Sequence, residues 1–188
     1  MENFLKIVDK YQDLILSTEK YIWENPEPGY REVKTNAYMV ENFERLGYAL
    51  NLAKDITGFT VTLDTGREGP TVMVMCELDS LINKSHPDCD KQTGAVHSCG
   101  HNAQCAAMLG LAAALKEEAV KEKLCGKIVL CVVPAEEGIE ISYRQSLMQK
   151  GIIEFATGKP EFIKRGFLDG VDIAFMVHAH SNNETEKG

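Results

Sequence analysis

The sequence predicts an α/β fold, a three-layer arrangement of one mixed sheet with helices on both faces. Two observations support this prediction. Short apolar segments typical of strands alternate along the chain with longer segments of helical periodicity. In addition, residues 71–76 and 127–133 are almost continuously apolar, as expected of strands that are covered on both faces. Cys76 and Cys131 lie in these two segments and are expected to be buried.

The N-terminal region is expected to form two helices. Apolar residues at three- and four-residue spacing between Phe4 and Ile22 predict one amphipathic helix, which the proline-containing segment 25–29 ends. A second helix should follow, and its buried face is expected to carry Val33, Ala37, Val40, Phe43 and Leu46.

Seven further elements follow along the chain. Strands are expected at residues 59–63, 71–76, 127–133 and 171–177, and helices at residues 102–123, 143–151 and 159–166. A doubly wound domain usually needs more strands than this to finish its sheet, so the sheet is expected to be incomplete.

Charge and composition exclude several classes of partner. The 188 residues carry a net charge of −8 and no dense basic stripe, which argues against nucleic-acid and anionic-membrane partners. The apolar runs are too short to span a bilayer, and the N-terminus lacks the pattern of a secretory signal. A cytoplasmic protein without a disulfide framework is therefore expected.

Polar residues follow three of the expected strands. Glu77 and Asp79 come after 71–76, the pair Glu136-Glu137 comes after 127–133, and His178 comes after 171–177. A fourth group, 97–102, directly precedes the Ala-rich helix. Because ligands of open α/β sheets bind outside the carboxyl ends of the strands, these groups are expected to meet in one cleft.

The residue types in these groups favour metal-assisted hydrolysis. Cys99 and His101 can reach one ion if the chain turns sharply at Gly100, and a thiolate with imidazole and carboxylate partners favours zinc or another transition metal. Neighbouring side chains diverge, so one member of the pair Glu136-Glu137 can bind metal while the other takes a proton from water.

Four motifs in this order resemble a known family. They are NPEPGYRE at 25–32, ELDSL at 77–81, HSCGHN at 97–102 and PAEEG at 134–138. The chain resembles, from about residue 15 to about residue 180, the aminoacylase/carboxypeptidase family of metallopeptidases in its amidohydrolase branch. That branch includes hydrolases of indole-acetyl amino acids, N-acyl amino acids and aminobenzoyl-glutamate. The resemblance implies a zinc-exopeptidase-like catalytic domain that acts on a small-molecule amide.

The resemblance also implies a role for each site residue. Cys99 would be shared by two divalent metal ions, with His101 and Glu137 completing the shell of one ion and His178 serving the other. Glu136 would be the general base and then the acid for the departing amine, and Asp79 would orient the site. Zinc is the expected metal, with manganese, cobalt and nickel as alternatives. Glu77 stands where the peptidase branches have a histidine ligand and is left out of the metal set, and the role of His180 stays open.

Residues 1–188 resemble only the N-terminal segment of the family's catalytic domain. The lid or dimerisation domain, through which a homodimer would form, and the C-terminal catalytic segment are both expected to be absent. The resemblance therefore implies that these 188 residues are inactive alone.

Two rival interpretations remain open. A structural zinc site could use His86, Cys89, His97 and Cys99, which would make the chain a non-catalytic metal-binding or interaction module. A hydrolase with Cys99 as nucleophile would be inactivated by alkylation and unaffected by chelators.

Overall fold

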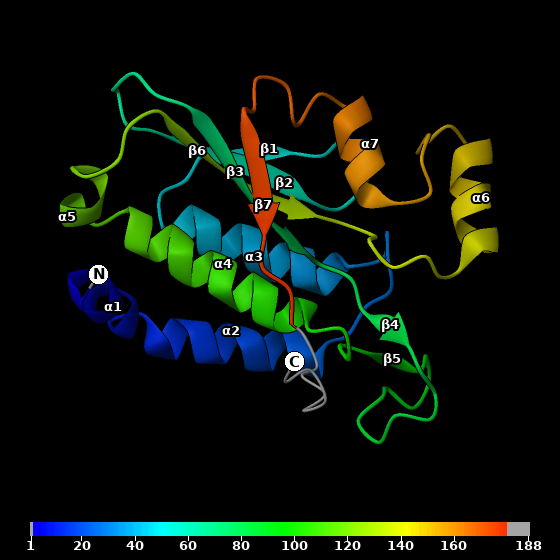
Figure 1. Ribbon diagram of the computed structural model, residues 1–188. Helices are drawn as coiled ribbons and strands as arrows, with labels where there is room; N and C mark the ends of the chain where they lie inside the picture. The colour runs from blue at the N-terminus through cyan, green and yellow to red at the C-terminus, as the bar shows by residue number, and fades with distance from the viewer. Residues whose placement is uncertain (1, 180–188) are drawn as a thin grey trace, which may run out of the picture.

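A computed structural model describes residues 2–179 of the protein (Figure 1). Its main sheet has the strand order β1-β2-β6-β3-β7. The strands are β1 (Leu50–Leu52), β2 (Phe59–Asp64), β3 (Thr71–Glu77), β6 (Lys127–Val133) and β7 (Ile173–Met176). β6, β3 and β7 run parallel, whereas β1 and β2 are antiparallel to their neighbours. The predicted mixed sheet is confirmed.

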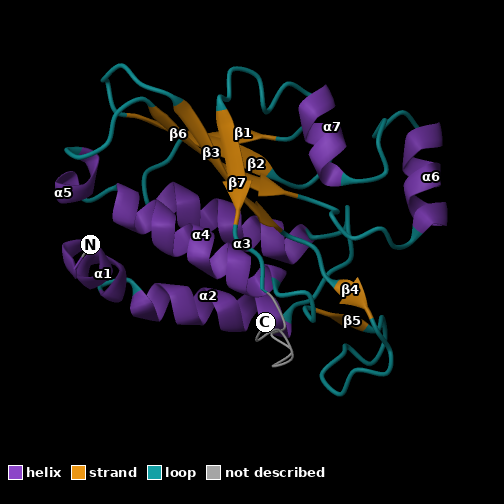
Figure 2. Cartoon of the chain, in the orientation of Figure 1, coloured by secondary structure: helices purple, strands orange, loops and turns teal. Residues whose placement is uncertain are grey.

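Helices cover both faces of this sheet, as predicted (Figure 2). On one face lie α3 (Val33–Arg45) and α4 (His101–Leu115), and α2 (Gln12–Glu24) packs against α4. On the other face α7 (Gly158–Lys164) packs against β6. The remaining elements are α1 (Glu2–Asp9), α5 (Glu118–Lys121), α6 (Ile141–Gln149) and a hairpin of β4 (Leu81–Ile82) with β5 (Ala95–Val96).

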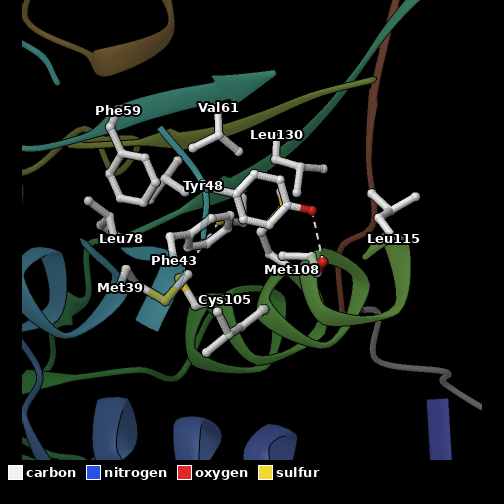
Figure 3. Close-up of a cluster of buried hydrophobic side chains, with 14 of the residues drawn as sticks. Met39, Phe43, Tyr48, Phe59, Val61, Leu78, Cys105, Met108, Leu115 and Leu130 are labelled. Carbon is white, nitrogen blue, oxygen red and sulfur yellow. Dashed lines mark hydrogen bonds between the residues drawn. The ribbon is translucent and has the colours of Figure 1, made fainter. Parts of the chain in front are cut away.

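The central strand β6 divides the interior into two cores. Leu130 and Val132 point to the core formed with α2, α3 and α4, while Val129 and Cys131 point to the core that contains Phe162 of α7. This alternation explains why the strand is apolar at every position after Lys127. In the first core the hydroxyl of Tyr48 donates a hydrogen bond of 2.8 Å to the carbonyl of Ala112, so the buried phenol is satisfied (Figure 3).

The strand predictions agree with the structure to within two residues at each end, and Cys76 and Cys131 are buried as expected. The short strands β1, β4 and β5 were not predicted. Among the described residues, no helix is both long and apolar enough to cross a membrane.

Three helix predictions need correction. The single helix expected from residue 4 to residue 22 is broken at Lys10 and Tyr11, whose side chains both hydrogen-bond to Glu117. The long helix expected at 102–123 is likewise divided into α4 and α5. The predicted buried face of α3 was also wrong in part, because Val33 and Ala37 are exposed.

The side of α3 that is buried carries Thr35, Met39, Asn42 and Phe43. Thr35 can be buried because its backbone amide and hydroxyl both donate to the carboxylate of Glu27, at 2.9 and 3.1 Å. Polar residues with such partners are not excluded from a core, which a pattern of apolar residues alone does not reveal.

Alanine variants of two neighbouring residues of α7 test how much the second core contributes to stability. Phe162 is fully buried and stacks on Phe167 with ring centroids 4.4 Å apart, whereas Ile163 is 59% exposed. We expect Phe162→Ala to lower the free energy of unfolding by about 3–5 kcal/mol, because it leaves a cavity. The control Ile163→Ala should change it by about 0.5 kcal/mol or less. Urea denaturation measures both, and equal effects would contradict the two-core arrangement.

Candidate metal centre

The candidate site lies where strands β3 and β6 end. These strands are parallel neighbours with Glu77 opposite Val133, so the residues that follow each strand meet. Asp79 connects the two strand ends, because its two carboxylate oxygens accept the backbone amides of Glu136 and Glu137, each at 3.0 Å. The side chain that the sequence placed in an orienting role thus fixes the backbone of both expected site carboxylates.

The turn at Gly100 brings the thiol and two imidazoles together. Gly100 has φ +95° and immediately precedes α4, a conformation that other residues rarely adopt. The Sγ of Cys99 lies 3.3 Å from Nε2 of His178, which follows β7. Ligand atoms of Cys99, His101 and His178 all lie within 4.8 Å of one another, close enough to share one ion.

His101 also belongs to a second group, with Glu77 and Glu136. Its Nε2 lies 3.0 Å from Oε2 of Glu77 and 3.9 Å from Oε2 of Glu136. Its Nδ1–H donates to the carbonyl of Asp79 at 2.8 Å. A histidine held in this way presents Nε2 to an ion, which is the usual arrangement of metal-binding histidines.

His178 has the same kind of support. Its Nδ1–H donates to the carbonyl of Ala179 at 2.7 Å, which leaves Nε2 facing the thiol of Cys99. Two histidines from different parts of the chain therefore direct Nε2 into one space.

The electrostatics of the site favour a cation. Burial alone would lower the pKa of His101, but the carboxylates of Asp79 and Glu77 outweigh it and raise the pKa to about 11. Burial and the nearby carboxylate of Glu137 raise the pKa of the Cys99 thiol to about 11. Without an ion, protons thus neutralise the excess negative charge, and a metal ion would displace them.

Buried polar atoms at this position have few partners in the described part of the chain. Oε1 of Glu137 has no hydrogen-bond partner, and Oε2 of Glu77 is paired only with Nε2 of His101, at 3.0 Å. A buried polar atom without a partner is costly, and sulfur, imidazole and carboxylate together suit a divalent transition metal. The residues at this site therefore fit such an ion.

Two residues of the site lie outside the set of ligands and catalytic residues predicted from the sequence. Glu77 was left out of the metal set, yet it is 1% exposed and contacts His101. Lys159, from the first turn of α7, forms ion pairs with Glu77 and, at 3.6 Å, with Glu136. Glu77 could have been found from its place at the end of β3, but no sequence signal connects Lys159 to the site.

The ligands of the rival zinc site are not brought together. Neither group of potential ligands found among residues 2–179 includes His86, Cys89 or His97. The thiol of Cys89 faces the carbonyl of Lys84 at 3.6 Å, and His97 is buried with burial lowering its pKa to about 4. The geometry does not support this rival interpretation. His180 lies outside the described residues.

The site thus places a thiol, imidazoles and carboxylates at the strand ends of an α/β sheet, an arrangement that can bind a divalent metal ion. Residues 73–188 match the family model of Peptidase family M20/M25/M40, and the chain belongs to this family. The resemblance expected from the sequence motifs is confirmed.

Named relatives agree with this membership. IAA-amino acid hydrolase ILR1-like 4 of Arabidopsis thaliana is 30% identical over 169 residues, which are 88% of this chain and 34% of the relative. A solved structure described as an aminohydrolase from methicillin-resistant Staphylococcus aureus superposes with a TM-score of 0.76 at 26% identity, covering 96% of this chain and 42% of the other. A Bacillus subtilis protein described as a dinuclear metal-binding peptidase of the M20 family has a TM-score of 0.72 at 21% identity, with 92% and 44% covered. The chain thus spans less than half the length of these proteins.

Alanine variants of two cysteines test whether Cys99 is a metal ligand. Cys99 faces His178, whereas Cys125 is exposed and belongs to neither ligand group. We expect Cys99→Ala to weaken zinc binding by more than the roughly 10–100-fold typical of partners outside the ligand shell, because a direct ligand is lost. Cys125→Ala should leave the affinity unchanged. Isothermal titration with zinc measures both, and equal affinities for the two variants would show that Cys99 is not a ligand.

Proposed function

We propose that the chain forms the metal-binding part of an amidohydrolase that cleaves the amide bond of an N-acyl amino acid, an aminobenzoyl-glutamate or a dipeptide-like substrate. The observation that carries this proposal is the convergence of Cys99, His101 and His178 beside the Glu136 carboxylate. Family membership and the relative that hydrolyses an amino-acid conjugate support the same reaction type.

The proposed ligand assignment is the one that the family resemblance implies, and three of its four residues form the first ligand group. Cys99 would be shared by two ions, His101 and Glu137 would hold one of them and His178 the other, with zinc first and manganese, cobalt or nickel as alternatives. The short distance between Cys99 and His178 and the unpartnered oxygen of Glu137 support this assignment. Bound ions would lower the pKa of a water molecule and polarise the amide carbonyl.

Glu136 is the proposed proton carrier. Its side chain is 35% exposed, so it can reach both the buried ligands and an incoming substrate. Glu136 would accept a proton from the attacking water and then donate one to the departing amine, as the base and acid of the same cycle. The bond from its backbone amide to Asp79 keeps it in place while its carboxylate acts. Lys159 forms an ion pair with this carboxylate at 3.6 Å, which helps to hold it beside the proposed ligands.

The isosteric variant Glu136→Gln removes the proton carrier and keeps the shape of the side chain. We expect its kcat for N-acyl amino acids to fall by about 100- to 10,000-fold, the usual contribution of general acid–base catalysis. Its zinc content should equal that of wild type, and the exposed control Glu44→Gln should keep full activity. The measurement is a chelator-sensitive hydrolysis assay on the full-length gene product. Retained activity in Glu136→Gln would refute this role.

We further propose that the complete enzyme covers the free side of β7 with more polypeptide, comprising the rest of the catalytic domain and a lid or dimerisation domain through which a homodimer would form. On this strand Ile173 and Phe175 are 56% and 51% exposed, and Val177, directly after it, is 72% exposed. Phe175 and Val177 line a cavity of about 470 Å³, whose apolar lining also includes Val74, Met108 and Leu111. Exposed apolar surface of this kind marks an interaction site.

This proposal predicts that the 188 residues alone hydrolyse none of the candidate substrates at an ordinary enzyme rate, although they bind divalent metal. The reason is that the substrate would meet only part of its pocket. Assays of the 188-residue chain and of the full-length gene product, on a panel of N-acyl amino acids, dipeptides and aminobenzoyl-glutamate, compare the two. Equal activity of both would overturn the proposal.

We also propose a cytoplasmic location. All six cysteines are free thiols, including Cys76 and Cys105, whose sulfurs lie 4.0 Å apart. Thiols that persist in this way fit a reducing compartment.

A further inference from the structure

Ala135 adopts an unusual conformation between β6 and the two site carboxylates. It is completely buried and has φ +52°, in the left-handed region that residues with a Cβ rarely adopt. Such a conformation persists only where surrounding groups enforce it, and it often occurs at functional sites. The groups that enforce it here are not those that form the metal centre.

A buried carboxylate holds the amide of Ala135. The backbone N–H donates to Oε1 of Glu32 at 2.7 Å, and the other oxygen of Glu32 accepts the hydroxyl of Thr57 at 2.6 Å. Glu32 is 0% exposed, so water does not compete for these bonds. Glu32 directly precedes α3 and lies more than one hundred positions before Ala135 in the chain.

A buried guanidinium holds the carbonyl of the same residue. Nη1 of Arg144 donates to the carbonyl oxygen of Ala135 at 3.3 Å and to that of Ala156 at 2.7 Å. Arg144 is also 0% exposed, and within the described residues it forms no ion pair. The amide of Gly158 donates to the same carbonyl of Ala135 at 3.0 Å.

We propose that Glu32 and Arg144 are positioning residues that together hold Ala135 in its left-handed conformation, and thereby direct the carboxylates of Glu136 and Glu137 into the metal centre. We name this pair the Ala135 clamp. The catalytic consequence of the clamp rests on the proposed function, whereas the clamp itself rests only on the hydrogen bonds of Ala135.

The direction of the two site carboxylates follows from the backbone. Three successive amides, of residues 135, 136 and 137, donate to buried carboxylates, the first to Glu32 and the next two to Asp79. With the backbone held in this way, the carboxylate of Glu136 lies 3.9 Å from Nε2 of His101, and that of Glu137 contacts the thiol of Cys99. If Ala135 returned to an ordinary φ, the peptide plane would rotate, so that Glu137 would leave its ligand position and Glu136 its place beside His101.

The segment is also closely packed. A Cβ on Gly158 would lie 1.7 Å from the carbonyl oxygen of Pro134, and a Cβ on Gly29 would lie 2.8 Å from Cα of Ala135. The clamp therefore sets the orientation of the Ala135 peptide within closely packed surroundings.

The test compares Glu32→Ala with Glu32→Gln. The alanine variant removes the acceptor, whereas glutamine keeps a carbonyl oxygen for the amide of Ala135. We expect Glu32→Ala to bind cobalt(II) about 10–100-fold more weakly, as when an outer partner of a ligand is lost. Its visible absorption spectrum should change as well, because the ligand geometry changes. Glu32→Gln should restore the wild-type affinity and spectrum.

Glu161→Ala is the matched control. Glu161 is also a buried carboxylate that accepts two backbone amides, those of Glu154 and Phe155 at 2.8 Å, but it does not contact residues 135–137. Its loss should lower the melting temperature without altering the cobalt(II) spectrum. If Glu32→Ala behaved in the same way, the clamp would be only a source of stability and the proposal would be wrong.

Hydrogen exchange separates the clamp from the proposed function. In the metal-free protein, the amide of Ala135 should exchange faster in Glu32→Ala than in wild type and Glu32→Gln. If wild-type protein bound no divalent metal, the proposed function would fail while this measurement still tested the clamp. Unchanged protection of Ala135 in Glu32→Ala would overturn the clamp itself.

Discussion

The two hydrogen bonds from Asp79 to the amides of Glu136 and Glu137 are the interaction on which the site depends. They can form because β3 and β6 are adjacent and parallel, so that segments more than fifty residues apart end side by side. Asp79 is completely buried, and its backbone carbonyl also accepts Nδ1–H of His101. One residue therefore orients the proposed base, a proposed carboxylate ligand and a proposed imidazole ligand.

The same physical device recurs around the site. Buried carboxylates accept hydrogen bonds from backbone amides, and the other carboxylates of the site point into the same space. Their combined negative charge requires a cation or protons. Burial, followed by the charge of Asp79, raises the pKa of Glu32 to about 7, which shows how costly a second carboxylate is at this depth. The ion pair between Lys159 and Glu77 offsets part of the same negative charge. A cation-binding site and its supporting carboxylates are thus one electrostatic unit.

Much of the fold and most of the site could be predicted from the sequence. Nearly continuous apolar runs predicted β3 and β6, which are covered on both faces. The rule on strand ends then predicted that Glu136, Glu137 and His178 meet at one edge. Prediction failed where tertiary contacts decided the outcome. The break at Tyr11 coincides with bonds to Glu117, and the buried face of α3 includes Thr35 because Glu27 satisfies it. Apolar periodicity contains no information about such partners.

Glu32 and Arg144, which act through the backbone of Ala135, were beyond the reach of the motifs. Glu32 lies within the NPEPGYRE motif, yet nothing local shows that its partner is the amide of Ala135, since the folded chain alone brings the start of α3 to the end of β6. Arg144 is similar, because an arginine in a polar helix is ordinarily exposed and only its burial against two carbonyls gives it a role. Side-chain ligands can be recognised by residue type and position. Positioning residues such as Glu32 and Arg144 can be recognised only from the folded geometry. For this reason the left-handed conformation of Ala135 was the informative observation.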